Sequence, residues 1–454
     1  MLSENGKRWH IFPCSCYTVL TYPQRPLRFQ FFEVKKLSNR TPDNILLLPA
    51  GVFEMTPARA AFVRHIEEVV LGVFRLWGYQ EVRTPSLEYV DTMSRGLASD
   101  ELDMAFKLVD RGTGKMMLMR SDVTPQVARM ASLALSRTPL PLRLCYMADV
   151  YRHPDDPSHP RREMIQAGVE LVGLDDPQAD AEVLAIGVEA LRTIGLSGVR
   201  MSVGQVRYAR GLFEEAALDK STEDLIVEAA CRKDRSEMER ILGQTNTSVR
   251  IREGILALTD LTGTVDVLDR AHEVAPNDTC RSAIENLRDV LALAVSYGVV
   301  SDNLSVDLGD LASFRYHTGP VFTGFVSGAG RAVLKGGRYD NLAGKYGRQA
   351  PATGFAIDLL EAVEIVSGHG TVGTAVDYLL VNRTSDREKG LRISVELRSL
   401  SRNVLCLIRN IPDEELGAYI AAHRIGQVLI LDDDGLSILD TDNNEKKPCK
   451  IEDL

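Results

Sequence analysis

The chain contains 454 residues, of which 44% are hydrophobic and 26% are charged, and it carries a formal net charge of −10 at pH 7. This length and this apolar content suffice for a sizeable core and indicate about two to three domains. The acidic balance is opposite to the basic surface of a protein that grips nucleic acid through its phosphates. Composition therefore indicates a globular protein and argues against a general nucleic-acid binder.

The seven cysteines are an odd number and show no repeated CxxC spacing. The sequence therefore indicates neither a disulfide framework nor a zinc ribbon. No stretch approaches the roughly 18 consecutive apolar residues needed to span a bilayer, and the N-terminus lacks the apolar core of a signal peptide. We expect a cytoplasmic protein without a metal site.

Residues 1–44 differ from the rest of the chain, because their aromatic residues and prolines are scattered without helical or strand periodicity. We expect this segment to be a poorly ordered N-terminal extension. Cys14 and Cys16 lie within it, and their close spacing favours two unremarkable thiols over a metal site. The main body of the protein is expected to begin at about residue 45.

A long amphipathic helix is predicted at the start of the main body. Thr56 and Pro57 suit its N-cap and its first position, and apolar residues then recur at spacings of three and four until Gly78. Residues 79–91 alternate as a strand that is interrupted by Pro85, and a proline favours an edge or interface position.

The motif RSDVTPQ at 120–126 follows an apolar strand predicted at 116–119. Asp122 and Thr124 are two residues apart, so on an extended chain both side chains project from one face and could together hold an ammonium group. The alternative is structural, because Thr124 followed by Pro125 suits the N-cap and first position of the next helix. On these residues alone, the capping role is favoured.

Residues 143–173 predict a strand, a long polar loop and a return strand. Arg152 lies at the end of the outgoing strand, and the return strand places Gln166 and Glu170 on one face. A guanidinium and two polar acceptors could hold the charged ends of an amino acid, or a phosphate. The loop histidines have no carboxylate or cysteine at ligand spacing, which favours solvated imidazoles over a metal site.

Five motifs follow one another in the order found in the histidyl-tRNA synthetases and their paralogues, and the chain resembles this family over about residues 46 to 366. The resemblance implies an α/β (α+β) fold of the class II aminoacyl-tRNA synthetase type, with an antiparallel sheet and flanking helices. The motifs are RSDVTPQ, the hairpin from VYRH to QAGVELVG, FRYHTG at 314–319, GGRYDNL at 336–342 and TGFAIDLL at 353–360.

The same resemblance implies a bound histidine and assigns a role to each polar residue around it. Asp122, Thr124 and Gln166 match residues that hold the ammonium group of histidine. Arg152 matches the arginine of the second class II motif.

Four further residues match the part of the family site that surrounds the imidazole. Glu170 matches an imidazole-binding carboxylate, and Tyr339 matches the tyrosine of GGRYD beside the ring. Tyr316 is retained in FRYHTG. His317 stands where the synthetases commonly carry a second tyrosine, so it is the least conventional of these candidates.

Three departures from the family pattern affect the ATP half of the expected site. Glu361 stands where the third class II motif carries an arginine, and Pro154 replaces an adenine-contacting glutamate. Ala312 occupies the position of a histidine-specific arginine, although Arg315 lies three residues later and could substitute. Adenylate formation needs positive charge on the phosphates, and lost arginines cost orders of magnitude in rate. We therefore expect no catalytic residues and no aminoacylation.

Two further segments complete the predicted organisation. Residues of about 205–300 are mostly helical and lie within the core assigned to 45–370. Residues 375–454 alternate strands and helices as a small α/β unit that resembles a degenerate anticodon-binding domain. From residue 375 onward this unit has eleven basic and fifteen acidic side chains, which offer no grip on phosphates, so tRNA binding is disfavoured.

Among the paralogues, the retained histidine site, the degenerate ATP motifs and the acidic surface resemble the regulatory subunits of ATP phosphoribosyltransferase. This resemblance implies a chain without chemistry or cofactor that binds the short catalytic subunit and is required for its activity in histidine biosynthesis. It also implies feedback inhibition by histidine and dimers within a hetero-octamer. Two alternatives stay open: a histidine-tRNA ligase with diverged motifs, and a synthetase-like amino-acid sensor.

Overall fold

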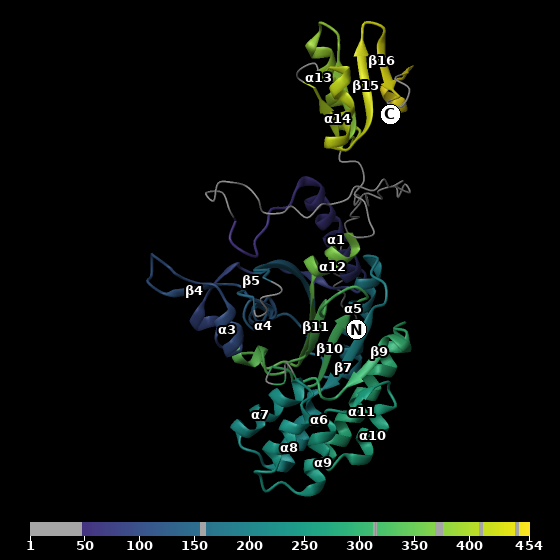
Figure 1. The fold of residues 1–454 in the computed structure, drawn as a ribbon. Coiled ribbons are helices and arrows are strands. Elements are labelled where there is room, and N and C mark those ends of the chain that lie inside the picture. Colours follow the sequence, from purple (N-terminus) through teal and green to yellow (C-terminus); the bar gives the residue numbers. More distant parts are fainter. Residues whose placement is uncertain are drawn as a thin grey trace, which may run out of the picture. The chain divides into compact units, whose positions relative to one another are not determined.

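The computed structural model describes residues 48–154, 160–311, 314, 316–367, 376–407, 412–440 and 445–454. The described residues fall into two compact units, one before residue 368 and one after residue 375 (Figure 1). The extension predicted at residues 1–44 lies outside the described part of the chain. Among the helices described, none is long and apolar enough to cross a membrane.

A nine-stranded sheet forms the centre of the larger unit, in the order β1-β5-β6-β12-β11-β10-β7-β9-β8. The six strands from β5 to β7 in this order pair with one another in antiparallel fashion, whereas β1 and β9 are parallel to β5 and β7, respectively. The predicted antiparallel sheet is therefore confirmed. The strands are β1 (Gln80–Glu81), β5 (Leu142–Tyr151), β6 (Glu163–Val172), β7 (Arg200–Gln205), β8 (Thr262–Gly263), β9 (Leu304–Asp307), β10 (Pro320–Phe325), β11 (Leu334–Arg338) and β12 (Ala352–Asp358).

Three helices pack against one face of this sheet: α1 (Pro57–Leu76), α5 (Pro177–Thr193) and α12 (Leu359–Ser367). Alternate residues of β6 and β12, such as Val169 and Phe355, join the helices in one apolar core. The ring of Phe355 meets Phe74 of α1 edge to face, with 5.9 Å between ring centroids. The opposite face of the same strands is left for polar side chains.

Helix α1 confirms the predicted helix start, because Thr56 occupies its N-cap and Pro57 its first position. The strand predicted at 79–91 is instead split between two sheets. Its first part is β1, at the edge of the large sheet, and its second part is β2 (Leu87–Tyr89), at the edge of a three-stranded sheet. Pro85 lies between the two strands, and both occupy the edge positions that a proline favours.

The three-stranded sheet pairs β2 with β4 (Met116–Met119), and β4 with β3 (Lys107–Val109). Strand β4 is the apolar strand predicted at 116–119. Short helices border this sheet: α2 (Val90–Met93), α3 (Ser99–Met104) and α4 (Thr124–Ser132). The sheet and α4 hold the RSDVTPQ motif against the polar face of the large sheet.

A group of helices follows β7, as predicted for residues of about 205–300, and gathers beside β7 and β9 (Figure 1). Ser248 and Asn277 cap two of them through their side chains. These helices are α6 (Val206–Ala216), α7 (Lys220–Cys231), α8 (Arg235–Leu242), α9 (Val249–Ala257), α10 (Val267–Val274) and α11 (Asp278–Ser296). Short 3-10 turns lie at Ser301–Asn303 and Ala343–Tyr346.

The C-terminal unit contains a five-stranded sheet in the order β14-β13-β15-β16-β17. Strand β13 is parallel to both of its neighbours, and α13 and α14 connect the parallel strands, which is the predicted small α/β unit. Its elements are β13 (Val376–Asn382), α13 (Arg387–Ser399), β14 (Val404–Cys406), α14 (Asp413–His423), β15 (Ile425–Asp432), β16 (Gly435–Leu439), β17 (Lys446–Pro448) and a 3-10 turn at Ile451–Asp453.

Candidate functional site

The candidate site lies on the face of the large sheet that α1 and α5 do not cover. In the register of β6 and β12, Glu170 is opposite Gly354 and Gln166 is opposite Asp358. Because side chains alternate between the two faces of a strand, residues four apart share a face, and Gln166 and Glu170 point to the same side, as the alternation along β6 predicts. The carboxamide of Gln166 accepts a hydrogen bond from the backbone N–H of Val123 at 3.3 Å, which ties this face to RSDVTPQ.

Glycines form the floor beneath Glu170. A Cβ added at Gly354 would come within 1.8 Å of Glu170 Oε2, and one added at Gly168 would come within 2.4 Å of the hydroxyl oxygen of Tyr146. Any larger residue at these two positions would occupy the space of the carboxylate and the phenol. Neither glycine was predicted as a site residue, because its role appears only when β5, β6 and β12 are placed in register.

Glu170 is the chemical centre of the site and is only 1% exposed. Hydroxyl groups from three other elements approach it: those of Tyr339, Thr124 and Tyr146, the last at 3.4 Å. Burial raises the pKa of Glu170 from 4.5 to about 8; the nearby carboxylate of Asp122 adds to the rise, whereas the hydroxyls oppose it. The carboxyl group is thus easily protonated, and it would retain a proton or bind a ligand N–H.

Thr124 does not have the capping role that its sequence context favoured. Helix α4 begins at Thr124 itself. Val123 is therefore the N-cap residue, and its side chain makes no capping hydrogen bond. The hydroxyl of Thr124 bonds to Glu170 instead, and Asp122 Oδ1 accepts the backbone N–H of Thr124 at 3.2 Å. The prediction was wrong because a fully buried carboxyl group needs a donor, while the helix start already has Asp122.

Arg152 and Asp122 meet in a hollow of about 10 Å³, which is lined by Glu101, Met104, Ser121, Asp122 and Arg152. Ser121 Oγ and Arg152 Nε are buried and have no hydrogen-bond partner among the described residues. Buried polar atoms are nearly always satisfied in native proteins. The two groups are therefore suited to an ordered water molecule or to a single polar atom of a ligand.

An aromatic wall closes another side of the site. The ring centroids of Tyr316 and Tyr339 are 5.6 Å apart, and His317 meets Tyr316 edge to face at 5.1 Å. Burial is the main reason that the pKa of Tyr316 lies well above its ordinary value. The nearby carboxylates of Asp122 and Glu170 raise this pKa further. All eight residues predicted from the sequence are therefore brought together around the turn at 122–124 and Glu170.

Tyr146 and Gln126 also belong to this region but were not predicted. Tyr146 lies on β5 directly opposite Gly168. It could have been predicted by aligning the alternating residues of β5 with those of β6. Gln126 is fully buried. Its Nε2 donates to the carbonyl of Pro85 at 2.8 Å and to Glu88 at 2.7 Å, and these bonds stabilise the RSDVTPQ turn. The direction of the Gln126 side chain could not be inferred from the sequence.

Carboxylates fill the place where the family pattern expects an arginine. Glu361 of α12 is bound by Arg331, with Nε–Oε2 and Nη2–Oε2 distances of 3.1 and 3.0 Å, and Arg331 also reaches Asp358 at 3.1 Å. Arg161 donates to Glu364 at 2.5 Å and lies 3.8 Å from Glu361. Arg331 and Arg161 are therefore balanced by the chain's own carboxylates.

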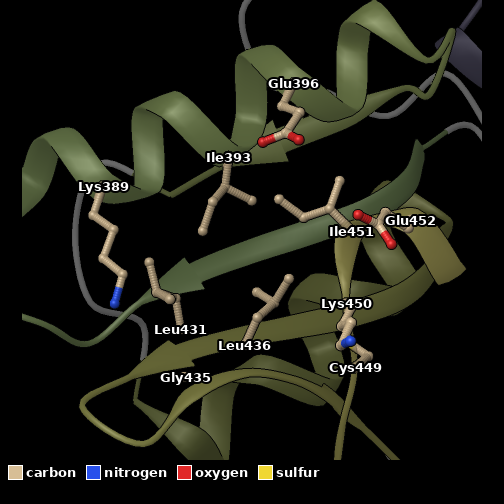
Figure 2. A pocket seen from close by; sticks show the side chains of 10 residues that line it. All are labelled: Lys389, Ile393, Glu396, Leu431, Gly435, Leu436, Cys449, Lys450, Ile451 and Glu452. Carbon is tan, nitrogen blue, oxygen red and sulfur yellow. The ribbon is translucent and has the colours of Figure 1, made fainter.

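A larger cavity of about 350 Å³ lies in the C-terminal unit and contains none of the eight predicted residues. Figure 2 shows Ile393 of α13 above Leu431 and Leu436, with Lys389 and Glu396 at the rim. Its apolar floor and mixed charges do not define a particular ligand. Over the described ranges of both units, no group of three or more histidine, cysteine, aspartate or glutamate side chains could hold a metal ion.

Comparisons with known proteins agree with the fold and with the motifs. A family model described as histidyl-tRNA synthetase matches residues 51–362. The ATP phosphoribosyltransferase regulatory subunit of Geobacter sulfurreducens is 40% identical over 353 residues, which are 77% of this chain and 80% of that protein. The corresponding subunit of Ruminiclostridium cellulolyticum is 32% identical over 409 residues, 89% of this chain and 97% of that protein.

Solved structures show the same architecture. A crystal structure described as an ATP phosphoribosyltransferase regulatory subunit/histidyl-tRNA synthetase from Bacillus halodurans has a TM-score of 0.75 and 25% identity, and it covers 86% of this chain and 99% of that chain. A histidyl-tRNA synthetase from Nostoc sp. PCC 7120 has a TM-score of 0.74 at 18% identity, with 88% of this chain and 96% of that chain covered, which concerns the fold alone.

Fold and site together define a core of the class II synthetase type, built like a histidyl-tRNA synthetase. Within that class, the chain belongs to the family of ATP phosphoribosyltransferase regulatory subunits. The relatives from Geobacter sulfurreducens and Ruminiclostridium cellulolyticum are named as regulatory subunits and not as catalytic ones.

Proposed function

We propose that this chain is the non-catalytic regulatory subunit of an ATP phosphoribosyltransferase, and that it binds free histidine at the Glu170 site. The observation that carries the proposal is the contrast between two neighbouring clusters on one sheet. Near Glu170, Ser121 Oγ and Arg152 Nε are buried without a hydrogen-bond partner among the described residues, whereas Arg331 and Arg161 beside Glu361 form ion pairs with the chain's own carboxylates.

The chemistry of the Glu170 cluster suits histidine. Glu170 and the hydroxyl of Tyr339 can accept and donate hydrogen bonds at an imidazole ring, and the aromatic wall packs against its faces. Asp122 supplies a negative charge for the ammonium group, with Gln166 and Thr124 beside it. These roles agree with those that the family resemblance implies for the same positions.

The cluster around Glu361 supports the absence of aminoacylation. Glu361 and Asp358 place negative charge beside Arg331, and Arg161 is held by Glu364 as well. A nucleotide triphosphate needs cations whose charge is not already balanced. An internal network of this kind would repel the phosphates instead of holding them.

Regulation requires that histidine occupancy changes the free energy of the complex. Histidine can inhibit only if it binds two conformations of the assembled enzyme with unequal affinity. The proposal therefore includes binding to the short catalytic subunit, a requirement for its activity in the first step of histidine biosynthesis, and dimers of this chain within a hetero-octamer.

The test combines three measurements on the full chain. Calorimetry should detect histidine binding and no ATP binding, and the short catalytic subunit should co-purify with the chain from the native cell extract. Histidine-dependent exchange of pyrophosphate into ATP should be absent. Exchange activity would replace the proposal with a diverged histidine-tRNA ligase, and stable capture of a different enzyme in place of the transferase would indicate a free-standing sensor.

A further inference from the structure

Arg210 of α6 holds the backbone on both sides of Tyr316. Its Nη2 donates to the carbonyl of Phe314 at 2.7 Å and to the carbonyl of His317 at 3.0 Å. This nitrogen carries two hydrogens, so it can serve both carbonyls at once. Tyr316 lies between these two residues in the chain, and a single side chain of the helical group therefore fixes the turn that carries part of the aromatic wall.

Helix α6 also binds both ends of this turn by other contacts. The guanidinium carbon of Arg210 lies 4.7 Å from the ring centroid of Phe314, and the buried ring of Phe213 meets Phe314 edge to face at 5.5 Å. Contacts of both kinds stabilise the packing of an aromatic ring. At the other end, the backbone N–H of Val206 donates to the carbonyl of Gly319 at 3.2 Å. The turn is thus anchored to one helix along its length.

The opposite side of the turn is bound to the segment that carries Tyr339. The backbone N–H of Thr318 donates to the carbonyl of Arg338 at 2.7 Å, and its hydroxyl donates to Asp340 Oδ2 at 2.8 Å. In return, the backbone N–H of Asp340 donates to Thr318 Oγ1 at 2.9 Å. Arg338 and Asp340 flank Tyr339, so these bonds hold the rings of Tyr316 and Tyr339 at their separation of 5.6 Å.

The side chain of Tyr316 depends on this hold. Its hydroxyl oxygen is buried and has no hydrogen-bond partner among the described residues. The ring lies beside Tyr339, whose hydroxyl bonds to Glu170. Because no described side chain fixes the hydroxyl of Tyr316, the backbone of the turn and the packing around the ring determine where this group lies in the site.

We propose that Arg210 is a positioning residue for the ligand: it holds Tyr316 beside Tyr339, and the helical group thereby sets the affinity of the site for histidine. This inference rests on the proposed binding of histidine at the Glu170 site. Without the guanidinium, the turn would occupy other positions for part of the time. A ligand binds only the fraction of molecules in the competent arrangement, so the apparent affinity falls with that fraction.

The test measures histidine binding to the full chain by calorimetry, with thermal unfolding as the check that each variant folds. Arg210→Met removes the donors and should weaken histidine binding about tenfold. Arg210→Lys keeps a cation that can donate to the carbonyls but lacks the planar guanidinium, and it should lose about threefold. Arg207→Met is the matched control, because Arg207 is exposed on the same helix, and it should bind histidine as the unmodified protein does.

A double-variant cycle separates the positioning of Tyr316 from a general structural effect. Tyr316→Ala should weaken histidine binding by itself. Adding Arg210→Met to it should change the affinity by less than about twofold, because the residue that Arg210 positions is then absent. If Arg210→Met does not fold, the same cycle with Arg210→Lys should show its loss disappearing in the Tyr316→Ala background.

Two results would overturn the role of Arg210 alone: unchanged histidine binding by Arg210→Met, or an equal loss with and without Tyr316. An unmodified protein that does not bind histidine would overturn the proposed histidine site, and the role of Arg210 with it.

Discussion

Glu170 and Gly354 face each other across β6 and β12, and a Cβ on residue 354 would stand 1.8 Å from the carboxylate oxygen Oε2. The side chain of Glu170 thus occupies the space that a side chain at residue 354 would fill. A buried carboxyl group is held in this place because the partner strand contributes a glycine. The same relationship explains why the site depends on residues about 180 positions apart in the chain.

Gly354→Ala should abolish measurable histidine binding, because the new methyl group would displace Glu170 or shift β12. Overpacking of this kind costs about 1–3 kcal/mol of stability. Calorimetry checks the binding, and thermal unfolding checks that the variant folds. Gly330→Ala is the matched control, since a Cβ there meets nothing within 4 Å. Normal histidine binding by Gly354→Ala would contradict the geometry described for Glu170.

Glu170 should make the stability of the ligand-free protein depend on pH. Its pKa is raised from 4.5 to about 8 by burial, so the folded state binds more protons than the unfolded state between these values. The stability that Glu170 contributes is therefore fully present below about pH 4.5 and is lost as the pH rises through about 8. Relative to Glu170→Gln, which stays neutral, the unmodified protein should lose about 4 kcal/mol between pH 5 and pH 9.

Urea unfolding of both proteins at several pH values measures this difference. Asp180 also has a raised pKa, about 6, and contributes in the same direction, but it is present in both proteins and cancels from the comparison. Parallel stability curves for the two proteins would show that Glu170 is not the titrating group.

Glu361→Arg should not create adenylation activity. The substitution restores the family's residue type, yet Arg161 and Arg331 would then lose a shared carboxylate and repel the new guanidinium. We expect no pyrophosphate exchange, a histidine affinity within about twofold of normal, and a loss of about 1–3 kcal/mol in the free energy of unfolding. Glu253→Arg, at an exposed position of α9, is the control for a surface charge reversal. Exchange activity in Glu361→Arg would mean that a single residue blocks the chemistry.

Glu88→Ala should destabilise the turn that carries Asp122 and Thr124. Glu88 is 8% exposed, pairs with Arg129 through both carboxylate oxygens and accepts from Gln126. Its removal leaves the half-buried guanidinium of Arg129 without its carboxylate partner and takes one hydrogen bond from Gln126, which costs about 3 kcal/mol. Urea unfolding measures the loss, and Glu68→Ala, on the exposed side of α1, should stay within about 0.5 kcal/mol of the unmodified protein.

Part of the site could be predicted because it depends on local patterns. The two-residue alternation along β6 places Gln166 and Glu170 on one face whatever the rest of the fold does, and the structure confirms this placement. The helix start at Thr56 and Pro57 is local in the same sense. The family resemblance supplied the remaining candidates, including Tyr316 and His317. No spacing rule could predict that these two residues lie close to Glu170.

Other features needed the three-dimensional register. Thr124 was expected to cap a helix, but a buried carboxyl group on another element competes for its hydroxyl. Tyr146 and Gly354 become site residues only when β5, β6 and β12 are aligned. Arg331 and Glu361 are thirty residues apart and meet because the connection between β10 and β11 lies beside the start of α12. Contacts of this kind depend on tertiary packing, which sequence periodicity does not encode.

The rate of the short ATP phosphoribosyltransferase subunit, measured with and without this chain and across histidine concentrations, tests the central claim most directly. We predict little activity for the catalytic subunit alone, strong activation by this chain, and a decline with histidine that Glu170→Gln abolishes while activation remains. A catalytic subunit that is equally active without this chain, at every histidine concentration, would contradict the account.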